Sequence, residues 1–67
     1  MSFEAFVKHV NRIIEKAGGG IKVRFSNEPE GGRYIAKCSD GTTITGNGSC
    51  LSLSVRWGSG HVAMAAV

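Results

Sequence analysis

Residues 2–17 repeat their hydrophobic side chains with the period of an α-helix. The hydrophobic positions follow the spacing i, i+3, i+4, i+7, which gathers them on one helical face and leaves polar residues on the other. Ser2 can cap the first turn, and Gly18-Gly19-Gly20 supplies residues that tolerate the left-handed conformation of a helix end. The pattern predicts an amphipathic helix over 2–17, with these residues on its hydrophobic face: Phe3, Phe6, Val7, Val10, Ile13, Ile14 and Ala17.

After the three glycines, the hydrophobic positions change to a two-residue repeat, which is typical of β-strands with one buried face. Short runs of turn residues separate the alternating segments. A helix followed by consecutive short strands predicts an α+β fold, with one N-terminal amphipathic helix packed on a four- to five-stranded antiparallel β meander. The 67 residues allow one domain, spanning 1–67. The predicted strands cover 21–25, 33–39, 42–45, 50–57 and 61–66, with a polar loop over 26–32.

The buried face of the second predicted strand depends on the length of the turn that follows it. If Asp40-Gly41 is a two-residue hairpin loop, the pairing puts Ile35 and Ile44 on one face of the sheet and Tyr34 on the other. The alternative is a loop longer than two residues. We expect Ile35 and Ile44 to face the core and Tyr34 to face outward.

The charge of the chain is moderately positive. Lysine and arginine exceed the acidic residues by 8 to 5, and the formal net charge of +3 favours an anionic partner such as nucleic acid or an acidic protein surface. The sequence shows neither a signal peptide nor an apolar run long enough to cross a membrane. We therefore expect a cytoplasmic protein with no membrane partner and with reduced cysteines.

The two cysteines do not form a recognisable metal or disulfide site. Cys38 and Cys50 lack the close spacing of paired metal ligands. On strands that are two positions apart they would lie about 9–10 Å from each other, whereas a disulfide needs Cα atoms within about 7 Å. No activated nucleophile, acid–base pair or phosphate-binding loop accompanies them. The sequence therefore predicts a non-enzymatic protein with no catalytic residue, no metal and no cofactor.

Basic and aromatic residues are the candidates for contact with a partner. Lys8, Arg12 and Lys16 recur every fourth residue and form a basic stripe on the predicted helix, although such a stripe can also be ordinary solubilising surface. On the predicted sheet, cations lie near Tyr34, and cations beside an exposed aromatic ring can hold phosphates and stack bases. Trp57 is in phase with the hydrophobic residues of its strand, so we expect it in the core. The candidate partner-binding residues are Lys8, Arg12, Lys16, Arg33, Tyr34, Lys37 and Arg56.

The last predicted strand, residues 61–66, is expected at an edge of the sheet. It is uncharged and lacks the lysine or proline that usually protects an edge from pairing. Such an edge could pair with a second copy to make a homodimer, or could accept a strand from another protein. The alternative is an edge hidden under a loop.

In size and general character, across the whole chain, the sequence resembles the small phage-encoded proteins, among them anti-CRISPR inhibitors. That resemblance implies a protein that binds and blocks a larger host protein or nucleoprotein complex in the host cytoplasm. The alternative function is a small basic nucleic-acid-binding module, which would use Lys8, Arg12 and Lys16 together with Arg33 and Tyr34.

Overall fold

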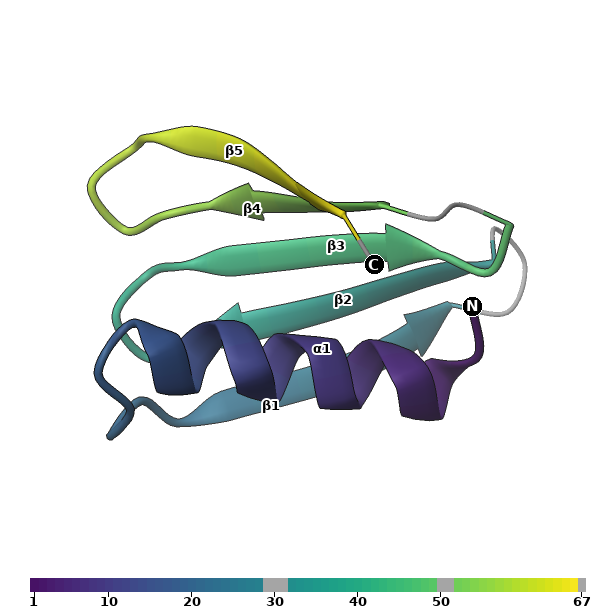
Figure 1. Cartoon of the computed structure of the whole chain (residues 1–67), viewed down its shortest axis with the longest axis horizontal. Helices are drawn as coiled ribbons and strands as arrows, with labels where there is room; N and C mark the ends of the chain where they lie inside the picture. Colours follow the sequence, from purple (N-terminus) through teal and green to yellow (C-terminus); the bar gives the residue numbers. More distant parts are fainter. Residues whose placement is uncertain (29–31, 50–51, 67) are drawn as a thin grey trace.

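The computed structural model describes residues 1–28, 32–49 and 52–66, which form one helix and five strands (Figure 1). All neighbouring strands are antiparallel and lie in the order β1-β2-β3-β4-β5, so the sheet is a meander. The helix α1 lies across one face of this sheet, nearest to β2 (Figure 1). The predicted α+β fold is confirmed. The elements are α1 (Phe3–Lys16), β1 (Val23–Glu28), β2 (Arg33–Cys38), β3 (Thr43–Asn47), β4 (Ser52–Arg56) and β5 (Val62–Ala66).

The two ends of α1 form as the sequence predicts. The Ser2 hydroxyl oxygen accepts a hydrogen bond from the Ala5 N–H at 3.1 Å, which satisfies a donor that the helix itself leaves free. At the other end, the Gly19 N–H donates to the Ile14 carbonyl at 3.0 Å. Gly19 has a φ of +69°, a conformation that favours glycine. The glycines therefore stop the helix and turn the chain back toward β1.

The core lies between α1 and the facing side of the sheet, and Phe6 is at its aromatic centre. The centroid of the Phe6 ring lies 5.4 Å from that of Tyr34 and 6.3 Å from those of Phe3 and Phe25. Gly46 faces this ring, and a Cβ added there would lie 2.9 Å from it, so the glycine allows the helix to pack closely. The buried hydrophobic residues are Phe6, Val10, Ile14, Ala36, Ile44, Leu53 and Val55.

A three-residue turn joins β2 to β3. The Cys38 N–H donates to the Thr42 carbonyl at 2.8 Å and the Gly41 N–H donates to the Cys38 carbonyl at 3.1 Å, so residues 39–41 form the turn. Gly41 has a φ of +93°, the left-handed conformation with which such a turn closes. The predicted two-residue loop Asp40-Gly41 was one residue too short.

This extra residue changes which face of β2 is buried. Ala36 pairs with Ile44, and both side chains are fully buried against α1. Since side chains alternate along a strand, Tyr34 shares the buried face with Ala36, and Ile35 points away from it. The burial of Ile44 was predicted correctly. The predictions of an inward Ile35 and an outward Tyr34 were wrong, because a shift of one residue in the pairing moves every side chain to the other face.

The strands also extend into segments that the sequence assigned to loops. Residues 26–28 continue β1 because they pair with β2 as far as Glu28 opposite Arg33, and β3 runs to Asn47. Strand pairing here overrides the weak strand preference of these polar residues. Cys50, at the start of the predicted fourth strand, lies outside the described residues.

The β2–β3 turn predicts a pH dependence of stability. The Asp40 carboxylate accepts hydrogen bonds from the Thr42 N–H at 2.9 Å and the Thr42 hydroxyl at 3.0 Å. These bonds, first that of the N–H and then that of the hydroxyl, lower the pKa of Asp40. Folding that lowers a carboxyl pKa stabilises the protein above the unfolded value, about 3.9, and this contribution is lost as the pH falls through the folded pKa.

We therefore expect Asp40→Asn to lower the Tm at neutral pH, and the difference from the wild type to shrink below about pH 4. Thermal unfolding followed by circular dichroism across this pH range measures it. A difference in Tm that stays constant with pH would show that the charge of Asp40 does not stabilise the turn.

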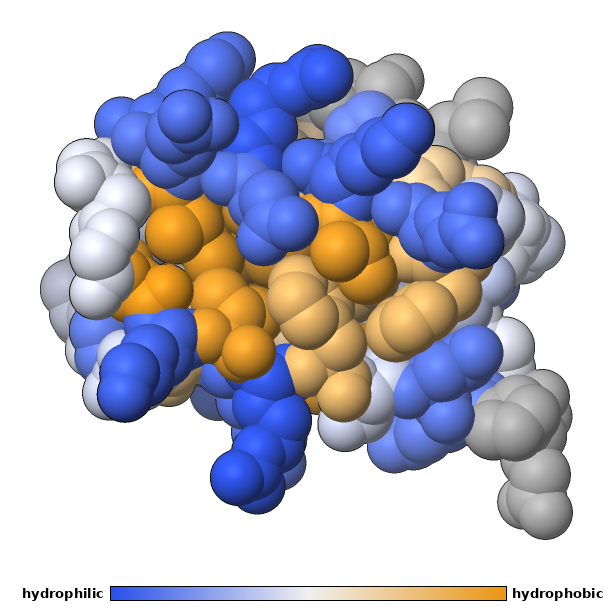
Figure 2. All heavy atoms as spheres, turned by 90° about the horizontal axis from the view of Figure 1, so that it is seen from below, coloured by the Kyte–Doolittle hydropathy of each residue, from blue (hydrophilic) through white to orange (hydrophobic). Residues whose placement is uncertain are grey.

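One helix does not cover the whole hydrophobic face of the sheet. Helices are about 10 Å wide and strands lie about 4.8 Å apart, so five strands extend beyond α1. Seen from below Figure 1, the β1 side of the molecule, hydrophobic side chains gather between hydrophilic ones (Figure 2). Val23 and Phe25 of β1 are half-buried and pack against the core, and at the other edge the sheet continues past the helix to β4 and β5.

Candidate polyanion-binding face

The face of the sheet opposite α1 is covered by no other element among the described residues (Figure 1). Because side chains alternate along each strand, the residues between the buried positions point to this face, which we call the open face. Most of them are polar or charged. The open face comprises Arg24, Ser26, Glu28, Arg33, Ile35, Lys37, Thr43, Thr45, Asn47, Ser52, Ser54, Arg56, Val62 and Met64.

A row of cations crosses the open face at one end of the sheet. Arg24 pairs with Lys37, Lys37 with Thr43, and Thr43 with Arg56, so the three cations lie in line across four strands. All three are exposed. Like charges directly opposite each other on neighbouring strands repel, so an anion between Arg24 and Lys37 would stabilise this arrangement. Arg24 was not among the candidate residues predicted from the sequence, although its alternation with Val23 already indicated an outward position.

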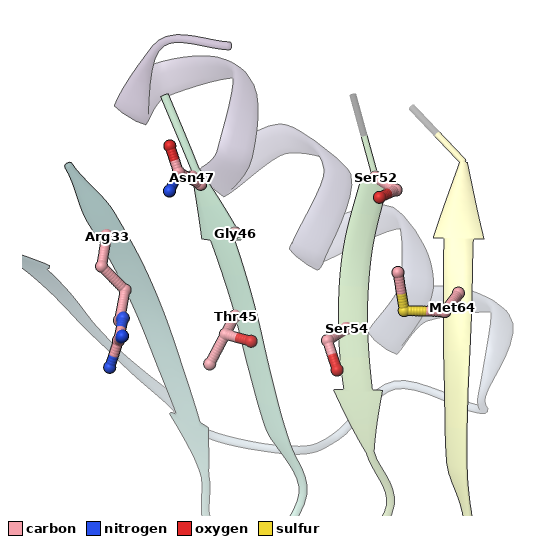
Figure 3. A pocket seen from close by; sticks show the side chains of 7 residues that line it. All are labelled: Arg33, Thr45, Gly46, Asn47, Ser52, Ser54 and Met64. Atoms are coloured by element: carbon pink, nitrogen blue, oxygen red, sulfur yellow. The ribbon is translucent and has the colours of Figure 1, made fainter. Parts of the chain in front are cut away.

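A shallow hollow of about 250 Å³ lies on the open face beside this row (Figure 3). Arg33 lies on its β2 side and Met64 on its β5 side, with the hydroxyls of Thr45 and Ser54 between them (Figure 3). Thr45 and Ser54 also line a second hollow that reaches Arg56, so a polar track joins the two cations. A guanidinium with neighbouring hydroxyls is suited to hydrogen bonding with phosphate oxygens. The first hollow is lined by Arg33, Thr45, Gly46, Asn47, Ser52, Ser54 and Met64.

The structure places the predicted binding residues on two opposite faces of the molecule. The helical stripe is exposed on α1, on the other side of the sheet from the open face. The site predicted from the sequence contained cations of both the helix and the sheet, but a flat partner cannot contact both faces at once. The residues of the open face are Arg33, Lys37 and Arg56, and those of the helical stripe are Lys8, Arg12 and Lys16.

Tyr34 belongs to the core side of the sheet and not to the open face. Its ring centroid lies 5.5 Å from that of Phe3 and 5.4 Å from that of Phe6, and its hydroxyl donates to the Met1 carbonyl at 3.0 Å. Trp57 is half-buried and packs against the core, as predicted. Among the described residues, the open face therefore carries no aromatic side chain.

Cys38 is half-buried on the core side of β2 and forms no disulfide within the described part of the chain. Burial and, to a smaller extent, the Asp40 carboxylate raise the pKa of its thiol, which disfavours the reactive thiolate. The described residues hold no group of three or more His, Cys, Asp or Glu that could bind a metal ion. They also contain no helix with the length and hydrophobicity needed to cross a membrane.

The open face offers a partner exposed cations, hydroxyls and an amide, together with one carboxylate, that of Glu28 opposite Arg33. Comparison of the chain with protein-family models, curated proteins and solved structures found no match in any of the three. The interpretation of this face therefore depends on the chemistry of its own side chains.

Proposed function

We propose that this protein binds nucleic acid through the open face, by contact with the phosphate backbone. The observation that carries the proposal is the row of Arg24, Lys37 and Arg56, with Arg33 and its hydroxyl-lined hollow alongside. Arginine, lysine, serine and threonine side chains are the groups that most often contact phosphate oxygens. A polyanion would neutralise several of these cations together and release its counterions, which is the main source of non-specific affinity.

The side chains of the open face favour a duplex over a single strand. Proteins that bind single strands usually stack bases on exposed aromatic rings, at about 1–3 kcal/mol per base. Here Tyr34 and Trp57 pack on the core side of the sheet, away from the cations. A duplex keeps its bases stacked internally and presents phosphates, so it matches a face of cations and hydroxyls. We therefore propose binding without sequence preference.

A phage-type inhibitor that blocks a host protein or nucleoprotein complex remains a prediction. A nucleoprotein complex exposes phosphate groups of its nucleic acid, so the open face would support such an inhibitor through the same contact. The non-enzymatic character and the host cytoplasm stay predictions in the same way.

Anisotropy titrations of a labelled duplex, and of a single strand of the same length, test the proposal across a salt series. We expect the duplex to bind more tightly, with log K falling linearly against log salt at a slope of about −4, because each neutralised phosphate contributes about −0.9 and the open face offers Arg24, Arg33, Lys37 and Arg56. No duplex binding at the lowest salt, or an affinity independent of salt, would rule the proposal out.

A further inference from the structure

The two edges of the sheet differ in how they are protected. β1 and β5 are the outermost strands, and β1 carries the exposed charges of Arg24 and Glu28. β5 carries no charge, and it holds the large hydrophobic side chains that are exposed among the described residues, Val62 at 54% and Met64 at 69%. Proteins normally place charges or proline on an edge strand to prevent pairing. β5 is therefore the edge that remains available.

The hydrogen-bonding phase of β5 identifies the backbone groups that face this edge. The Trp57 N–H donates to the His61 carbonyl at 2.8 Å, which makes these residues a hydrogen-bonded pair. Such pairs alternate along an antiparallel ladder, so Ala63 and Ala65 also direct their backbone groups toward β4. The residues between them direct their N–H and C=O groups outward. These are Val62, Met64 and Ala66, with Met64 at the centre.

An apolar groove of about 400 Å³ runs beside β5 on the core side of the sheet. It forms where the sheet extends past α1. Met64 borders this groove as well as the hollow of the open face, so hydrophobic surface reaches the edge from both sides. Apart from Met64, its lining includes Ile13, Trp57, Ala63 and Ala65, and Lys16 of α1.

We propose that β5 pairs with β5 of a second copy of this chain, antiparallel, about a two-fold axis beside Met64. In this register the Met64 N–H of each copy donates to the Met64 carbonyl of the other, and Val62 pairs with Ala66, giving about six backbone hydrogen bonds. The two Met64 side chains lie together on the open face. On the groove side, Ala63 of one copy lies opposite Ala65 of the other, and these small side chains allow the backbones to approach.

Symmetry and charge favour a second copy as the occupant of this edge. Val62, Met64 and Ala66 direct their backbone groups outward in the same phase, so β5 of a second copy can pair with them about a two-fold axis at Met64. β5 itself carries no charge, and the cations nearest to it lie on neighbouring elements, Arg56 on β4 and Lys16 on α1. Arg56 is the cation of the open face nearest this edge, on β4. The two copies of Arg56 would lie three strand spacings apart or more, at least roughly 14 Å, which exceeds the Debye length of about 8 Å at physiological salt.

The dimer would have a defined consequence for the open face. A two-fold axis perpendicular to the sheet keeps both copies of α1 on one side and both open faces on the other. The cations of the two copies would then form one continuous surface. Dimer formation itself needs no nucleic acid, so this proposal and that of nucleic-acid binding can fail separately.

Sedimentation equilibrium of the wild type, Met64→Lys and Ser26→Lys tests the dimer. Ser26 is the matched control because it lies in the same row of the open face as Met64 but on the other edge strand. We expect the wild type and Ser26→Lys to dimerise with rising concentration and Met64→Lys to stay monomeric, with the same circular dichroism for all three. A monomeric wild type, or equal behaviour of the two variants, would overturn the proposal.

Cysteine cross-linking tests the register, in a background in which Cys38 and Cys50 are replaced by serine. Met64→Cys should form a disulfide-linked dimer on mild oxidation, because a hydrogen-bonded pair separates Cα atoms by about 5.5 Å, within the range for a disulfide. Val62→Cys should not, since its two copies would lie about 13 Å apart along the strands. Cross-linking of Val62→Cys as rapid as that of Met64→Cys would contradict the register.

Discussion

Replacing Arg33, Lys37 and Arg56 together with glutamine is expected to weaken duplex binding about a hundredfold. Non-specific dissociation constants are about 10⁻⁴ to 10⁻⁶ M. Dividing the corresponding binding free energy over about six to ten phosphate contacts gives about 1 kcal/mol per contact. Three lost contacts therefore cost about 3 kcal/mol. The slope of log K against log salt should also become shallower by about 3. Anisotropy titrations at several salt concentrations measure both quantities.

The matched control replaces Lys8, Arg12 and Lys16 of the helical stripe with glutamine. Each triple change lowers the formal net charge of +3 by three, so the two variants differ only in the face that loses its cations. All six side chains are exposed, so both variants should fold. We expect the helical variant to lose less than about tenfold in affinity, through the weaker overall field. An equal or larger loss would place the nucleic acid on α1 and not on the open face.

The helix and the strands could be predicted from the sequence because their signals are local. The buried face of β2 could not, because it depends on whether the turn at Asp40-Gly41 has two or three residues. Thr42 stabilises the three-residue turn. Its hydroxyl donates to Asp40 at 3.0 Å and accepts from the Gly58 N–H, in the β4–β5 turn, at 3.1 Å. Because the β4–β5 turn is distant from Asp40 in the sequence, this contact cannot be predicted from the residues around Asp40.

The candidate site was predicted in its parts but not in its arrangement. Arg33, Lys37 and Arg56 could be recognised as cations of strands, but their common face follows from the register of two hairpins, β2–β3 and β3–β4. The hydroxyl-lined hollow was missed for the same reason. Thr45 and Ser54 are ordinary polar positions in the sequence and become neighbours only because β3 pairs with β4. A shift of one residue in that pairing would have placed them apart.

Phe6→Ala is expected to lower the free energy of unfolding by about 3–5 kcal/mol. The Phe6 side chain is fully buried and packs against rings from α1, β1 and β2. A hydrophobic core in a chain this short rarely supplies more than about 3–5 kcal/mol of stability, so this change should leave much of the protein unfolded at room temperature. Urea denaturation followed by far-UV circular dichroism measures the loss.

Phe3→Ala is the control for this change, because it removes the same kind of side chain from the same helix. Phe3 is only half-buried, so we expect a cost of about 0.8–1.5 kcal/mol, about half that of burying a whole phenylalanine. Both variants lose the stacked contact between Phe3 and Phe6, whose ring centroids lie 6.3 Å apart. The difference between them therefore measures burial beneath α1 and not aromatic stacking. Equal losses would mean that the enclosed position of Phe6 adds no stability beyond the aromatic contacts that Phe3 and Phe6 both make with Phe25 and Tyr34 of the sheet.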